Sequence, residues 1–140
     1  MKWLLPAIAA ALLAASPALA QEAPGGVPLG SGVQRGIEQL NNSDQAGYVT
    51  LFGHGTSTML VAEVLGGPGG RTQMTAVQRG KNCASMETAI AQRAGDLHNG
   101  RGRGSVPMAE SRLLSGNYVF VVYSSDAPGA RPVACAQLFQ

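Results

Sequence analysis

The sequence predicts an all-β fold, a barrel or sandwich of short strands, and three observations support this class. The 19 glycines and 8 prolines among 140 residues are more helix breakers than a helical bundle tolerates. Hydrophobic residues make up 45% and charged residues 13%, which excludes a disordered chain. Short runs of β-branched and aromatic residues alternate with turn residues. A chain of this length is expected to form one domain.

Residues 1–20 are predicted to be a secretory signal peptide. Lys2 supplies a positive charge, the stretch from Trp3 to Ala15 is uncharged and apolar, and Ala18-Leu19-Ala20 is a small-x-small cleavage site. A transmembrane anchor is the alternative, but the apolar run is shorter than the ~20 residues that span a bilayer. We therefore expect a periplasmic or secreted mature chain with no stable membrane anchor after cleavage.

The N-terminal part of the mature chain is expected to be irregular. Residues 21–34 are rich in Gly and Pro and are predicted to be a flexible lead-in to a β-domain over residues 35–140. The first strand of this domain is expected at Arg35–Leu40, as an edge strand. Asn41–Asp44 follows as a turn, because short polar side chains bond to their own backbone.

A β-hairpin and a third strand are predicted next. Gly47–Phe52 and Thr56–Leu65 are apolar runs on either side of the turn Gly53-His54-Gly55, a pattern typical of a hairpin. Thr72–Arg79 is expected to be the third strand. Period-2 alternation puts three of its side chains on one face: Met74, Ala76 and Gln78.

The segment Cys83–Arg103 is less regular, and two interpretations stay open. It could contain a short helix with Met86, Ile90 and Arg93 on one face, or it could be a loop pinned by a disulfide. Gly104–Met108 is expected to be a strand that its proline restricts to an edge or a bulge.

The C-terminal part contains the strongest strand pattern. Ser111–Gly116 fits one helical turn ended by glycine. Tyr118–Tyr123 is the best strand of the chain, Asp126–Gly129 is a turn, and Pro132–Phe139 is the closing strand. The chain thus has seven or so short strands, as in a sandwich or barrel.

Cys83 and Cys135 are the only cysteines, and both lie in the part predicted to be exported. An even number of cysteines in a small secreted domain indicates one disulfide. Two free thiols and a two-cysteine metal site are the alternatives; no other soft ligand lies beside either cysteine in the sequence.

Two segments carry a family resemblance. TAVQRGKNCAS resembles a strand with a His-x-His pair followed by Gly and a first Cys, and LLSGNYVFVVYSSDAPGARPVACAQLFQ resembles a Val-Val-His strand leading through a loop to an Ala-Cys-Gly strand. In order and spacing they are similar to copper/zinc superoxide dismutase-like domains, or to chordin-like repeats, over roughly Gly47–Gln140. The resemblance implies a Greek-key β-barrel or sandwich of about seven to eight strands, with a Cys83–Cys135 disulfide joining a loop to the last strand.

The resemblance also implies where metal ligands have been lost. Ala76 and Gln78 stand at the His-x-His pair, and Tyr123 stands at a later copper histidine. Ala76 has no donor atom, an amide is a weak ligand, and one phenol does not replace several imidazoles. A zinc site would need several His or Asp residues, and Asp96 and His98 are the only weak candidates. We therefore expect a retained scaffold without catalytic residues or a cofactor.

The sequence thus predicts a non-catalytic domain with a binding or structural role. The alternative is a superoxide dismutase-type enzyme or a copper-handling protein that binds copper or zinc at a non-standard site built on His54, His98 and Tyr123. Soft thioethers could add to such a site, although isolated methionines more often fill cores. The candidate thioethers are Met59, Met74, Met86 and Met108.

Other functions find little support. A net charge of +2 is too small to direct the chain onto nucleic acid, and Arg101–Gly104 is a single short copy of an Arg-Gly tract. Arg71, Arg79 and Lys81 could form a local basic patch if the third strand and its following turn fold together, but a solvated rim of the barrel is the favoured interpretation. The chain has no GxSxG, GxGxxG or GxxxxGK[ST] motif. The sequence identifies no partner.

Overall fold

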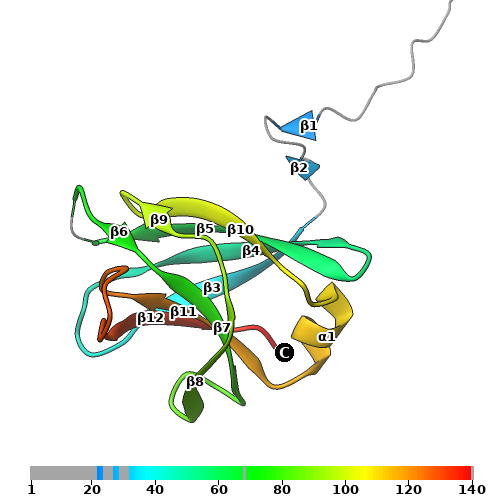
Figure 1. Cartoon of the computed structure of the whole chain (residues 1–140). Coiled ribbons are helices and arrows are strands. Elements are labelled where there is room, and N and C mark those ends of the chain that lie inside the picture. Colours follow the sequence, from blue (N-terminus) through cyan, green and yellow to red (C-terminus); the bar gives the residue numbers. More distant parts are fainter. Residues whose placement is uncertain (1–21, 24–26, 29–31, 68, 140) are drawn as a thin grey trace, which may run out of the picture.

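The structure is a computed structural model that describes residues 22–23, 27–28, 32–67 and 69–139 (Figure 1). These residues form twelve strands and one helix. In chain order they are β1 (Glu22–Ala23), β2 (Val27–Pro28), β3 (Val33–Gln39), β4 (Ala46–His54), β5 (Ser57–Leu65), β6 (Thr72–Gln73), β7 (Thr75–Gly80), β8 (Met86–Arg93), β9 (Leu97–His98), β10 (Arg101–Val106), α1 (Glu110–Ser115), β11 (Tyr118–Tyr123) and β12 (Pro132–Gln137).

Ten strands form one antiparallel sheet in the order β6-β9-β10-β5-β4-β3-β12-β11-β7-β8. The sheet curls, so that β4, β5 and β10 lie above β11 and β12 in Figure 1, and α1 covers one end. β6 and β7 lie near opposite ends of this order, yet only Met74 separates them in the chain. The continuous segment Thr72–Gly80 therefore brings the ends of the sheet together, and the fold is barrel-like.

Apolar side chains cover both faces of β7, β11 and β12. Because side chains alternate along a strand, Val77, Phe120 and Val122 point into the main core between the two halves of the sheet. Their neighbours point the other way, and all six residues of β11 are buried. These neighbours form a smaller group, here called the outer cluster: Ala76, Val119, Val121, Tyr123 and Cys135.

Several sequence-based predictions are confirmed. β4 and β5 pair from Ala46↔Leu65 to His54↔Ser57 around a turn at Gly55, whose φ is +62°. The Asn41–Asp44 turn forms, with positive φ at three of its residues. The two faces of the third strand are as predicted, and α1 ends at Gly116, whose amide donates to Arg112 O.

Three element predictions are wrong. The segment around Met86 is neither helix nor loop but strand β8, because its backbone pairs with β7 and this ladder overrides the weak helical pattern. β3 is not an edge strand, since it lies between β4 and β12. The strand expected at Gly104–Met108 begins earlier, at Arg101, and ends before Pro107, which has no amide to donate.

The all-β class and the barrel-like shape are confirmed. The predicted number of strands and the Greek-key arrangement are not. The sheet has ten strands rather than seven or eight, and two of them, β6 and β9, have only two residues each. The Greek-key arrangement stays a prediction.

The predicted signal peptide and most of the lead-in lie outside the described residues. Within the lead-in, β1 and β2 pair with each other, with Ala23 opposite Val27.

Candidate functional site

The three positions that the resemblance assigns to copper ligands lie together on the outer face of the barrel. Ala76 pairs with Val121 across β7 and β11, and the Tyr123 hydroxyl donates a hydrogen bond to Gln78 Oε1. Ala76 and Tyr123 belong to the outer cluster, and Gln78 is 1% exposed. Residues from two strands thus meet at one buried place.

Gln78 uses both ends of its amide. Its Nε2 donates to Glu87 O at 2.7 Å, at the point where the register between β7 and β8 slips. Its Oε1 accepts from Tyr123. In the part of the chain that the structure describes, no buried side-chain nitrogen or oxygen lacks a hydrogen-bond partner. The polar atoms at this place are therefore satisfied by the protein itself.

Burial raises the pKa of the Tyr123 hydroxyl above its ordinary value of 10.0, and the hydrogen bond with Gln78 opposes this only in part. Tyr123 is therefore a neutral phenol at physiological pH. A phenol binds a metal ion as the phenolate, which burial disfavours here. The side chains present do not fit a copper ion: one is a neutral phenol, one is an amide with both ends engaged, and the third, Ala76, has no donor.

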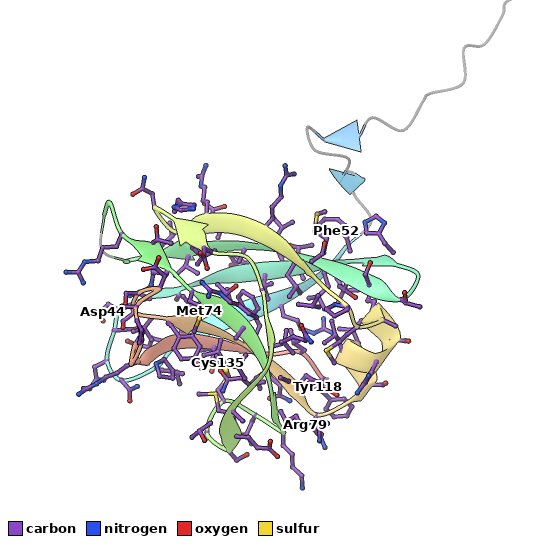
Figure 2. All side chains as sticks on the ribbon, viewed as in Figure 1. Asp44, Phe52, Met74, Arg79, Tyr118 and Cys135 are labelled. Atoms are coloured by element: carbon purple, nitrogen blue, oxygen red, sulfur yellow. A yellow bond between two sulfur atoms is a disulfide. The ribbon has the colours of Figure 1, made fainter. Side chains whose placement is uncertain are left out.

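The outer cluster is covered by loop residues and by the first residue of β8. Met74, Met86, Leu40 and Ala130 pack against it, and so does Cys83. Cys83 forms the predicted disulfide with the fully buried Cys135, with 5.9 Å between the two Cα atoms. The disulfide attaches the β7–β8 loop to β12, and Cys135 is labelled in Figure 2. It also indicates an oxidising, extracellular-type environment.

The weak zinc candidates have other partners. Asp96 forms an ion pair with Arg93 Nη2 at 3.1 Å, and His98 Nδ1 is 3.1 Å from Thr72 Oγ1. Among the described residues, no three His, Cys, Asp or Glu side chains are grouped as around a metal ion.

The two histidines are far apart. His54 is opposite Ser57 at one end of the β4–β5 hairpin, whereas His98 is opposite Arg101, which pairs with Glu63 near the other end of β5. Six residues of strand separate these ends, or roughly 20 Å. One metal ion cannot bind both imidazoles.

The four methionines are also dispersed. Met74 and Met86 pack on the outer cluster, while Met108 is part of the main core. Met59 lies on β5 opposite Phe52 of β4. Two of the four thioethers thus lie at the outer cluster and the other two lie elsewhere, so the four do not form one thioether site.

The glycines of the Arg-Gly tract have a packing role. A Cβ on Gly102 would lie 2.1 Å from Asp96 O, and one on Gly104 would lie 2.2 Å from Gly95 N. The backbone before β9 therefore passes so close to β10 that only glycine fits at these two positions. This close approach explains the tract without any ligand.

Sequence reasoning missed a cavity at one end of the barrel. Arg79, Lys81 and Arg112 line a cavity of about 780 Å³ between the β7–β8 loop and the α1–β11 connection. Arg79 and Lys81 were expected in a solvated rim with Arg71, which does not line the cavity. The sequence did not indicate this cavity because its third cationic residue, Arg112, comes from α1, more than thirty residues further along the chain.

Comparison with known proteins identifies no relative: no family model matches the chain, and no curated protein or solved structure is significantly similar to it. None of the helical structure in the described residues is long and apolar enough to cross a membrane.

Proposed function

We propose that this chain is an exported, non-catalytic β-domain that keeps a superoxide dismutase-like scaffold and has a binding or structural role. The observation that carries the proposal is the contact between Tyr123 and Gln78. At the place where the resemblance puts copper-binding imidazoles, a neutral phenol and an amide bond to each other.

The positions of these residues support the scaffold part of the proposal. Ala76, Gln78 and Tyr123 are separated by up to 47 positions in the sequence, yet they meet on one face of the sheet. Ligands of one metal ion would have to meet in the same way. The nearby disulfide between a loop and β12 is the arrangement that the resemblance implies, and it supports an oxidising compartment.

Metal analysis of the purified, oxidised mature protein tests the proposal. We expect no stoichiometric copper or zinc, no superoxide dismutase activity, and no saturable copper binding in a titration. The proposal predicts that Tyr123→Phe and its matched control Tyr48→Phe, at a 59% exposed position, give the same copper titration as the wild type. Stoichiometric copper with dismutase activity would overturn it.

A second variant separates the copper-handling alternative. If His98 contributed to a non-standard site, His98→Ala would weaken copper binding, and an unchanged titration removes this histidine from consideration. The structure gives a site built on both histidines no support, since His54 and His98 lie near opposite ends of β5. The candidates that do meet, Tyr123, Met74 and Met86 at the outer cluster, are tested by the Tyr123→Phe titration.

A further inference from the structure

The cavity near α1 has a positively charged lining. Three cationic side chains line it, Arg79, Lys81 and Arg112, and Glu87 is its one carboxylate. Within the described residues, no ion pair involves any of the three cations. The lining therefore has a net charge of +2 that is not neutralised by the protein.

The walls of this cavity are held in place by specific contacts. Gly80 N donates to Asn117 O at 2.9 Å, which ties the last residue of β7 to the α1–β11 connection. Arg79 pairs with Tyr118 across β7 and β11, and the guanidinium carbon of Arg112 is 6.0 Å from the Tyr118 ring centroid. Figure 2 shows Arg79 and Tyr118 at the same end of the molecule, below α1. The aromatic ring thus orients one arginine and lies beside another.

The β7–β8 loop is itself restrained. Lys81 lies two residues before Cys83, whose disulfide fixes the loop to β12. The cationic groups therefore come from three anchored elements, so less loop entropy is lost when a ligand binds.

A second, smaller cavity continues the first. It measures about 320 Å³ and shares Arg79, Glu87, Arg112 and Tyr118 with its neighbour. Its remaining lining is mostly apolar and comes from β8 and from the segment before α1, with Ile90, 43% exposed, on one side and Pro107 and Met108 on the other. Together the two cavities form a groove, here called the cationic groove, in which Arg79 and Arg112 line both halves and the β8 side adds an apolar strip around Ile90.

We propose that the cationic groove binds a phosphate monoester with an apolar substituent. A dianionic phosphate matches the net charge of the lining, and guanidinium groups bind phosphate oxygens through paired hydrogen bonds. The apolar substituent would lie along the exposed side chains of Ile90 and Pro107. The volumes are in the range of small-molecule sites, which exceeds what an inorganic anion fills. The phosphate could belong to a soluble ester or to a lipid headgroup.

This inference rests on the binding role in the proposed function but not on the lost metal site. The two can therefore fail separately: copper analysis tests the metal site, and phosphate binding is measured in buffer free of transition metals.

Calorimetric titration with octyl phosphate tests the inference. We expect saturable binding that weakens with salt. Arg79→Gln and Arg112→Gln should each weaken it about ten- to a hundredfold, the cost of losing a hydrogen bond to a charged group. Arg71→Gln is the matched control, because it removes the same charge from an exposed position outside the groove. All three variants should keep the urea midpoint of the wild type. Lys81→Gln replaces any variant that does not fold.

The apolar strip around Ile90 has its own test. Ile90→Ser should weaken octyl phosphate binding several-fold and leave inorganic phosphate binding unchanged, and octyl sulfate, with a single charge, should bind more weakly than octyl phosphate. Sedimentation with vesicles of phosphatidic acid in phosphatidylcholine distinguishes the lipid source from the soluble one. Absence of octyl phosphate binding, or equal weakening by Arg71→Gln and Arg112→Gln, would overturn the inference.

Discussion

Reduction of the Cys83–Cys135 disulfide is expected to lower the free energy of unfolding by about 4 kcal/mol. The disulfide joins residues separated by 52 positions. In the chain-entropy account, closing a loop of this length removes about 14 cal/mol/K from the unfolded chain, which is about 4 kcal/mol at room temperature. The folded state contributes in the same direction, because the disulfide holds the β7–β8 loop over the outer cluster.

Urea unfolding of the oxidised and the reduced wild-type protein measures this difference. Cys135 is fully buried, so replacing it with a smaller residue would leave a cavity that itself lowers stability. Reduction breaks the disulfide without removing any side-chain atom heavier than hydrogen, so the measured difference reports the cross-link alone. The slope of the free energy against urea should rise on reduction, since the unfolded chain without the cross-link exposes more surface.

Cys83→Ala is the matched control, because Cys83 is only partly buried and the variant cannot form the disulfide. Its stability should be the same with and without reductant and close to that of the reduced wild type. A difference below about 1 kcal/mol between the oxidised and reduced wild type would refute the reasoning, because the entropic contribution alone is several times larger.

Three further variants test the packing. Tyr123→Phe should cost about 1–3 kcal/mol in urea unfolding, because Gln78 Oε1 loses its buried partner. Since burial raises the Tyr123 pKa above 10.0, the folded protein holds this proton more tightly than the unfolded chain; its stability should fall as pH rises above about 10, and less steeply in Tyr123→Phe. Phe120→Ala, at a 1% exposed position, should cost about 3–5 kcal/mol by the same measurement. Gly102→Ala should cost more than about 1 kcal/mol, whereas the control Gly36→Ala, whose Cβ meets nothing within 4 Å, should not destabilise the protein.

The sequence predicted best those elements whose residue types match their surroundings in the fold, such as apolar β-forming residues in a buried strand or glycine in a tight turn. Tyr118–Tyr123 is an uninterrupted run of β-branched and aromatic residues because both of its faces are covered, and the Gly-containing turn of the β4–β5 hairpin has the positive φ that glycine allows. β8 could not be predicted in this way. Most of its residues are exposed, so no alternation of apolar and polar residues marks it, and its conformation comes from pairing with β7.

The candidate site shows the same division. The sequence pointed to Ala76, Gln78 and Tyr123 as three positions, and the structure adds that two of them bond to each other. This contact depends on how β7 and β11 are aligned, which no local pattern encodes. The cationic groove was missed for a similar reason, because Arg79 and Arg112 meet only through Tyr118, which lies on a third element.

β12 lies between β3 and β11, in the middle of the sheet, although residues 132–137 are synthesised after all the strands that they connect. Until these residues leave the ribosome, β3 and β11 each present an open edge to other nascent chains. The two parts of the sheet, β6-β9-β10-β5-β4-β3 and β11-β7-β8, can therefore join only after translation has passed residue 137. A message truncated just before residue 132 would yield an aggregation-prone product instead of a smaller stable domain.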